Sequence, residues 1–304
     1  MFAFPARFPL PALPSSVSGM SIHPRVVCSS ITLRRRPLPE ALALIRAEGF
    51  GAIDLGALPG VCDHVPERLD ADGVASVAAT LEGRGLAVAS INADVGDMNR
   101  PLDAAAADGR REHLARLVEL CRAVGAPALV LPNGSQGHAP LRDEASDLDR
   151  SAEALAEAAE QVGAAGLRLW VEAQHSGRLC RDLERATALT RRLEGHDVGV
   201  VLDFSHVVAA GDDPAAAIEA LGPRVEHVHL RDAVRGDIHR SIGRGDVDFE
   251  AAIGALEAGG YRGLYSLELE TDDVEESDRA AEAGRAARHI GRLLDAAGAA
   301  GAGS

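Results

Sequence analysis

Short β-rich runs alternate with helical segments along this chain, and this alternation constrains the fold more than any other feature of its sequence. Runs such as 128–132 are apolar and rich in strand-forming residues, whereas segments such as 110–124 carry apolar side chains at helical spacing. Eight such pairs fit a (β/α)₈ barrel, or TIM barrel, which takes roughly 250 residues. An open doubly wound sheet is the alternative, but no GxGxxG phosphate loop follows the first strand. The predicted strands are 26–31, 52–55, 87–92, 128–132, 167–172, 198–203, 225–230 and 264–269.

We predict a single α/β domain, the barrel, over residues 21–296, because no linker divides the chain. Residues 1–20 contain Pro and Ser but lack the uninterrupted apolar run of a secretory signal, so we expect a disordered extension. Met20 is an alternative to Met1 as the start of translation. The low-complexity tail, 297–304, is expected to be flexible.

Composition excludes several classes of function. All 31 basic residues are arginine, since the sequence contains no lysine, and this excludes Schiff-base aldolases, pyridoxal-phosphate enzymes and Walker-A NTPases. The 46 acidic residues bring the net charge to −15, which argues against binding a nucleic-acid backbone. The four cysteines form no CxxC pair, and no stretch approaches the roughly 20 apolar residues of a membrane span. We therefore expect a soluble protein of the cytoplasm.

Polar residues gather at the ends of the last four predicted strands. In a TIM barrel the carboxyl ends of the strands carry the active site, and here they carry Glu172, Asp203, His229 and Glu268. Isolated ionised carboxylates are too costly to bury there, and a divalent cation is the simplest partner. Three carboxylates and one imidazole suit Mn²⁺, Mg²⁺, Co²⁺ or Zn²⁺. We predict one divalent metal ion, with Mn²⁺ as the first choice. For Glu172 taken alone, pairing with an arginine is the alternative.

Further histidines lie close to these residues in the sequence. His227 and His229 face the same way, and only the one nearer the strand end should reach the metal, so His227 is interpreted as a core residue or a residue behind the ligands. His206 follows Asp203 by three residues and is expected to contact substrate or a second metal, with helix capping as the alternative. His175, three residues beyond a predicted ligand, is a candidate for the pocket wall.

The loop 232–248 combines three arginines with three glycines. Arg235, Arg240 and Arg244 are suited to bind a carboxylate or phosphate of the substrate, because the guanidinium group binds both in a bidentate fork. A flexible, solvated lid is the alternative interpretation of this loop.

Four segments of the sequence carry a resemblance to a known family. WVEAQH, VLDFSHVVAAGDDP, HVHLRDAVRGDIHRSIGRGDVDF and GYRGLYSLELE, all within about 170–270, resemble the xylose isomerase-like TIM-barrel superfamily. That superfamily includes ketose 3-epimerases, hydroxypyruvate isomerases, inosose dehydratases and endonuclease IV. The resemblance implies a homodimer or homotetramer. In the epimerases a further glutamate stands where this chain has Arg178, so the chain departs from the ketohexose epimerases at that position.

The resemblance also implies roles for individual residues. Glu172, Asp203, His229 and Glu268 correspond to the metal ligands, and the two glutamates to the catalytic acid/base pair on opposite faces of the substrate. His206 and Arg235 correspond to residues that hold substrate oxygens. We assign His175 and His239 to substrate binding as well.

These observations predict a divalent-metal-dependent isomerase or epimerase of a sugar or keto-sugar. The reaction would proceed by proton abstraction next to a carbonyl through a metal-stabilised enediolate. The substrate is expected to be a small carbohydrate or keto-acid. A dehydratase or lyase of a keto-sugar or keto-acid is the alternative, because the same four ligands serve that reaction.

Two other classes of function are weighed against this prediction. An endonuclease IV-like phosphodiesterase is suggested by Asp237 and His239, which match the D-x-H pair of that enzyme's third zinc. Two of its other histidine ligands are replaced by Asn92 and by Pro132 or Asn133, and the net charge of −15 argues in the same direction. A non-catalytic subunit is the third class, and the intact acid/base pair argues against it.

Overall fold

The computed structural model describes residues 22–302, and these form a closed parallel barrel. Its strands follow one another in the order β1, β10, β7, β6, β5, β4, β3, β2. This confirms the predicted TIM barrel, although the last strand is shorter than expected. The predicted extension 1–20 lies outside the described residues. The strands of the barrel are β1 (Val26–Ser29), β2 (Ala52–Ala57), β3 (Ala87–Ala93), β4 (Ala128–Pro132), β5 (Arg168–Glu172), β6 (Val198–Asp203), β7 (Val225–Leu230) and β10 (Tyr265–Leu267).

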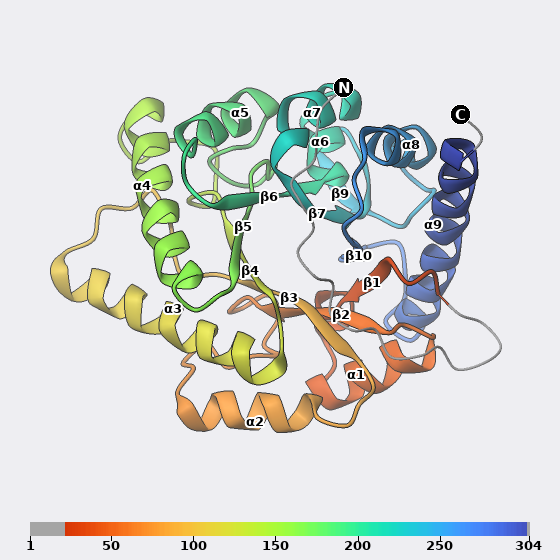
Figure 1. The fold of residues 1–304 in the computed structure, drawn as a ribbon, viewed down its shortest axis with the longest axis horizontal. Helices are drawn as coiled ribbons and strands as arrows, with labels where there is room; N and C mark the ends of the chain where they lie inside the picture. Colours follow the sequence, from red (N-terminus) through yellow and green to blue (C-terminus); the bar gives the residue numbers. More distant parts are fainter. Residues whose placement is uncertain (1–21, 303–304) are drawn as a thin grey trace.

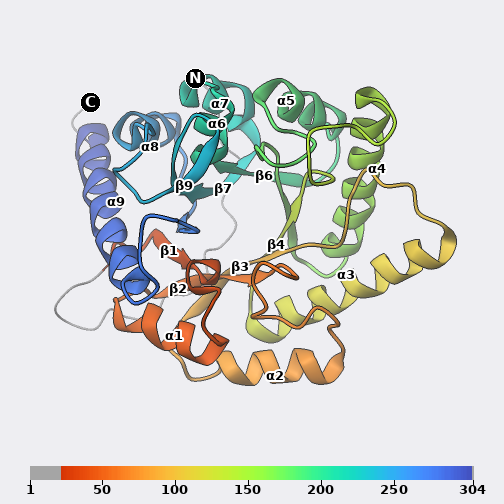
Figure 2. The ribbon, with the colours of Figure 1, turned by 180° about the vertical axis from the view of Figure 1, so that it is seen from behind.

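Helices surround the barrel as an outer ring, which Figures 1 and 2 show from opposite sides. Helix α6 (Phe204–Ala210), directly after β6, was not expected from the sequence. Helix α9 (Arg279–Ala302) extends into the expected flexible tail, so residues 297–302 are helical. Two short 3₁₀ helices complete the set, η1 (Ser30–Leu33) and η2 (Gly222–Arg224). The remaining helices are α1 (Leu38–Ala47), α2 (Ala71–Leu81), α3 (Ala104–Val124), α4 (Glu144–Gly163), α5 (Leu183–Arg192), α7 (Pro214–Leu221) and α8 (Phe249–Gly259).

Aspartates begin most of these helices. The side chain of each accepts a backbone N–H of the first turn, which satisfies a donor that has no partner inside the helix. Such a cap contributes about 1 kcal/mol, and the negative charge also interacts favourably with the helix dipole. Part of the acidic excess of the chain therefore stabilises its helices. The capping residues of α2, α3, α4, α5, α7 and α8 are Asp70, Asp103, Asp143, Asp182, Asp213 and Asp248.

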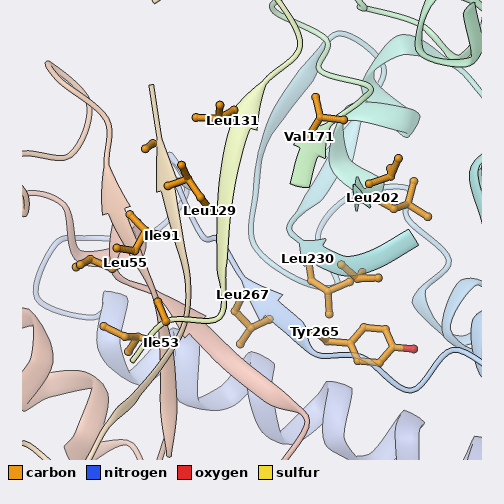
Figure 3. Packing of buried hydrophobic residues seen from close by; sticks show 14 of the residues in the cluster. Ile53, Leu55, Ile91, Leu129, Leu131, Val171, Leu202, Leu230, Tyr265 and Leu267 are labelled. Carbon is orange, nitrogen blue, oxygen red and sulfur yellow. The ribbon is translucent and has the colours of Figure 1, made fainter. Parts of the chain in front are cut away.

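Apolar side chains pack in two layers because strand residues alternate between the two faces of the barrel wall. Outward-facing residues such as Ile53, Leu131 and Val171 belong to one large buried cluster between the strands and the helices (Figure 3). Inside the barrel the apolar clusters are small and separate: one contains Ala52 and another contains Trp170. The interior therefore has room for buried polar side chains.

The segment after β7 folds back as an antiparallel hairpin of β8 (Asp232–Val234) and β9 (Asp237–Arg240). The fully buried Asp232 carboxylate accepts backbone N–H groups of Gly243 and Gly245 at 2.8 and 2.9 Å, and of Val247 at 3.1 Å. These bonds fix the glycine-rich stretch to the barrel, so the loop is an ordered structure and not a solvated lid.

Among the described residues, none of the helices combines the length and the apolarity needed to cross a membrane.

Candidate metal centre

A cavity of about 300 Å³ opens where the strands of the barrel end. The arc formed by β2, β3 and β4 contributes mainly apolar residues, among them Leu58 and Pro132. The opposite arc, from β5 to β10, contributes charged and imidazole side chains. Its polar lining residues are Glu172, His175, Arg178, His206, Arg231, Glu268 and Glu270.

The barrel brings Glu172, Asp203, His229 and Glu268 together at the base of this cavity. Each residue offers a ligand atom that lies within 4.8 Å of those of the other three, and all four are buried. Nδ1 of His229 lies 3.3 Å from Oε2 of Glu268 and 3.7 Å from Oε1 of Glu172. Because parallel strands all end at the same rim, residues more than 90 positions apart in the sequence converge there.

Four atoms of this cluster have no hydrogen-bond partner among the described residues: Oε1 of Glu172, Oδ2 of Asp203 and both ring nitrogens of His229. A buried polar atom without a partner costs about 1 to 3 kcal/mol. Despite burial, the neighbouring charge of Glu268 raises the pKa of His229 well above its ordinary value, so the local field favours a positive charge. The donor set and this field both fit a divalent cation.

The two glutamates of the cluster differ in proton affinity. Burial raises the pKa of Glu172, and the charge of Glu268 raises it further. Burial acts on Glu268 in the same direction, but His229 and then Arg231 outweigh it and hold the pKa of Glu268 below its ordinary value. The two carboxyl groups are therefore chemically distinct.

His175 and His206 stack beside the cluster, with ring centroids 3.9 Å apart. Nδ1 of His206 accepts the backbone N–H of Ser176 at 3.1 Å, and Nδ1 of His175 accepts that of Gly177 at the same distance. Neutral His175 therefore carries its proton on Nε2, which lies 3.8 Å from Glu172. Nε2 of His206 lies 3.8 Å from Glu172 and 3.5 Å from a terminal nitrogen of Arg231. Burial lowers the pKa of both rings, which favours their neutral forms.

Glu172, His175 and His206 also form a group whose ligand atoms lie within 4.8 Å of one another, close enough to hold a metal ion. His206 itself lies within α6 and does not cap it, since Asp203 occupies the N-cap position. His239 does not line the cavity, and its Nδ1 lies 2.7 Å from the carbonyl of Glu270. Asp237 accepts the backbone N–H of His239 at 2.8 Å, and neither residue belongs to a metal-binding group among the described residues.

None of the three loop arginines lines the cavity. Arg235 is exposed at the turn of the hairpin, Arg240 pairs with Asp237, and Arg244 pairs with Asp273. The structure does not bring Arg235 to the substrate side, where the resemblance would place it.

Arg231 and Arg178 line the cavity instead. Arg231 is buried and donates to Glu270 at 3.0 Å. Arg231 is not among the residues predicted from the sequence. Its spacing of two residues from His229 is the signal that both side chains face the same way. Arg178 donates to Asp94 at 2.9 Å and to the carbonyl of Gly134 at 3.0 Å, and the sequence showed it only as a departure from the epimerases.

The other positions compared with the nuclease have structural roles. Asn92 donates to Oε1 of Glu268 at 3.2 Å, and Asn133 donates to the carbonyl of Glu172 at 3.0 Å. Both amides therefore hold parts of the site in place and offer no imidazole to further metal ions.

Comparison with known proteins agrees with this geometry. A family model described as "Xylose isomerase-like TIM barrel" matches residues 42–293. The chain belongs to this family. It is 31% identical over 244 residues to an L-ribulose 3-epimerase of Mesorhizobium japonicum, covering 78% of this chain and 77% of that protein. It is 27% identical over 184 residues to an inosose dehydratase of Clostridium perfringens, covering 51% of this chain and 61% of that protein.

A solved structure of the IolI protein with a bound zinc atom has the same fold. It superposes with a TM-score of 0.71 at 19% identity, and the match covers 89% of this chain and 98% of that one. The relatives of this chain thus include enzymes that epimerise and enzymes that dehydrate small polyhydroxylated molecules.

Proposed function

We propose that this chain is a divalent-metal-dependent isomerase or epimerase of a sugar or keto-sugar. The observation that carries the proposal is the convergence of Glu172, Asp203, His229 and Glu268, two of them glutamates of opposite pKa shift, at the base of a cavity of small-molecule size. The 31% identity to an L-ribulose 3-epimerase supports it.

The four residues would hold the ion, with Mn²⁺ as the expected metal and Mg²⁺, Co²⁺ or Zn²⁺ as alternatives. A bound divalent ion supplies positive charge that stabilises negative charge developing on substrate oxygens. The cavity and the net charge of −15 together favour a small carbohydrate or keto-acid over nucleic acid as the substrate.

The side chains of the cavity would transfer the protons and orient the substrate. One of Glu172 and Glu268 removes the proton next to the substrate carbonyl, and the other returns a proton. Asn92 fixes Oε1 of Glu268 by a hydrogen bond of 3.2 Å, which orients that carboxyl group. His175, through Nε2–H, and His206 would bind substrate oxygens.

A dehydratase or lyase acting on a keto-sugar or keto-acid is the second candidate. Arg178 favours it, because a cationic side chain in the cavity wall suits a substrate with a carboxylate or an additional carbonyl group. The identity to an inosose dehydratase supports the same candidate.

We also propose a cytoplasmic protein that forms a homodimer or homotetramer. The four cysteines are buried and unpaired, which suits a reducing compartment.

Proton NMR in D₂O tests the proposal. The Mg²⁺-loaded protein is incubated with ketoses, inososes and hydroxy-keto acids, and we expect the signal of the α-proton to disappear in one of these classes. A new vinylic signal would identify the dehydratase instead. Glu268→Gln should slow the exchange by about 100-fold or more, because a catalytic acid or base contributes roughly that much.

Glu250→Gln, at an exposed position of α8, is the matched control and should exchange at the wild-type rate. Exchange in no substrate class, with metal binding confirmed by calorimetry, would contradict the proposed proton transfer.

A further inference from the structure

The imidazole of His229 has two different neighbours at its two nitrogens. Nδ1 faces the carboxylates of Glu268 and Glu172, at 3.3 and 3.7 Å. Nε2 faces the other way and lies 3.5 Å from Oδ2 of Asp54. Asp54 comes from β2, so β2 contributes a carboxylate behind a ligand that β7 supplies.

Asp54 is a fully buried carboxylate whose contacts are imidazoles. Its Oδ2 lies 2.7 Å from Nε2 of His227, which is also fully buried. His227 and His229 are two residues apart on β7 and point to the same face, so one carboxylate reaches both rings. Burying a carboxylate is costly unless it is paired, so this position calls for a specific role.

Trp170 holds the ring of His227 from its other side. The two rings stack with centroids 5.0 Å apart and planes 15° apart, and the indole N–H donates to Glu226 at 2.8 Å. Gly199 makes room for this arrangement, because a Cβ atom there would lie 2.6 Å from the indole. His227 is thus fixed in place, and it fixes Asp54 in turn.

A histidine binds a metal ion through a nitrogen that carries no proton, and the partner of the other nitrogen determines which one that is. Nε2 of His229 makes no hydrogen bond, but the carboxylate of Asp54 lies 3.5 Å from it, and a negative charge there favours the tautomer that carries its proton on Nε2. The proton of neutral His229 therefore lies on Nε2, and the lone pair of Nδ1 points into the cluster.

We propose that Asp54 is a positioning residue of the metal centre: its negative charge holds the proton of His229 on Nε2 and so directs the lone pair of Nδ1 toward Glu172, Asp203 and Glu268. The inference rests on the metal site of the proposed function. In this role Asp54 would act through His229 and would bind neither metal nor substrate itself.

Metal binding without turnover tests this role. Calorimetric titration of the chelator-treated protein with Mn²⁺ compares the wild type with Asp54→Leu, Asp54→Asn and Asp147→Asn. Removing the carboxylate in Asp54→Leu should raise the Kd by about 10- to 100-fold, as loss of a partner behind a metal ligand does. Asp54→Asn keeps one acceptor oxygen and should bind with intermediate affinity.

Asp147→Asn is the matched control, because Asp147 is a buried carboxylate that accepts from Asn99 and does not line the cavity. It should bind Mn²⁺ with the wild-type Kd. Wild-type affinity in both Asp54 variants would overturn the inference.

A second measurement needs no variant at Asp54. NMR of the ¹⁵N-histidine-labelled wild type loaded with ¹¹³Cd²⁺ should show cadmium coupling to Nδ1 of His229 and a proton on its Nε2. Coupling to Nε2, or a proton on Nδ1, would overturn the inference. Failure of the wild type to bind Mn²⁺ or Cd²⁺ at all would instead contradict the metal site of the proposed function.

Discussion

Arg231 is among the largest side chains that the described part of the fold buries completely. Its Nε donates to Ser205 at 3.3 Å, one terminal nitrogen donates to Glu270 at 3.0 Å, and the other lies 3.7 Å from Asp203. A guanidinium group thus links a predicted metal ligand to the wall of the cavity. At the scale of single residues, the stability of the fold and the proposed binding of substrate therefore both depend on Arg231.

Replacing Arg231 by Met should affect both properties. We expect the free energy of unfolding to fall by about 1 to 3 kcal/mol, because Glu270 loses one of its two arginine partners and keeps Arg34, and the KM to rise about tenfold or more. Urea denaturation and steady-state kinetics measure the two effects. Arg235→Met, at the exposed turn, is the control and should change the free energy of unfolding by less than about 0.5 kcal/mol. A rise in KM in Arg235→Met would indicate that the hairpin closes over the substrate.

His64 should make the fold sensitive to acid. Its Nδ1 lies 2.9 Å from the hydroxyl of Ser30, and its Nε2 lies 2.9 Å from the carbonyl of Arg36. Burial lowers the pKa of His64 below the ordinary 6.5, against the opposing effects of the Arg36 carbonyl and Asp63. As the pH falls, His64 of the unfolded chain therefore binds a proton before His64 of the folded chain does. Its contribution to the free energy of unfolding is present above pH 6.5 and is lost as the pH falls below that value.

Comparison with His64→Gln isolates this contribution. Between pH 6.5 and 5.5 the wild type should lose up to about 1.4 kcal/mol per pH unit more than the variant. Urea denaturation at several pH values measures the difference. Parallel curves for the two proteins would show that His64 does not titrate in this range.

At the scale of elements, the hairpin β8–β9 and the stretch that follows it form one unit around Asp232. A Cβ atom at Gly245 would lie 2.3 Å from Oδ1 of Asp232 and 2.4 Å from the carbonyl oxygen of Ala233. The chain can approach this closely only because residue 245 is a glycine.

Gly245→Ala should therefore displace the stretch and lower the free energy of unfolding by about 1 to 3 kcal/mol, as overpacking does. Gly254→Ala is the matched control, because a Cβ atom at this position of α8 meets nothing within 4 Å, and alanine is the better helix former. Thermal unfolding compares the two variants. Equal melting temperatures of the two variants would mean that the stretch around Asp232 accommodates the added methyl group without loss of stability.

Much of the barrel and part of the site could be predicted because they depend on periodicity. The positions of β4 and β5 follow from apolar runs, and a barrel brings strand ends together whatever the details of packing. Spacing alone does not determine where a loop side chain points. By its spacing from His229, Arg235 corresponds to a substrate-binding arginine of the epimerases, but it does not line the cavity. Arg231, which continues the alternation of β7, does line it. The part played by Asp54 depends on contact across the barrel, which no local pattern encodes.

At the scale of the whole molecule, the barrel closes where β1 pairs with β10, the first strand with the last. The proposed ion would join carboxylates from β5, β6 and β10 around this closed ring. It would bind only the folded state and should raise its stability.

Removal of the metal by a chelator should lower the melting temperature by about 5 °C or more, since an ion at 100 times its Kd adds about 2.7 kcal/mol. Added Mn²⁺ should restore it. Asp203→Asn, which removes one ligand charge, should respond much less to either treatment. Differential scanning calorimetry measures all three, and identical melting curves with and without metal would contradict a stabilising ion.

The stacking of Trp170 on His227 has a further consequence for anyone who studies this protein in solution. Trp170 is the only tryptophan of the chain, so its emission arises from a single environment. That environment connects through His227 and Asp54 to His229. The molecule therefore contains its own optical probe, and the fluorescence of unlabelled protein should report events at the centre of the barrel.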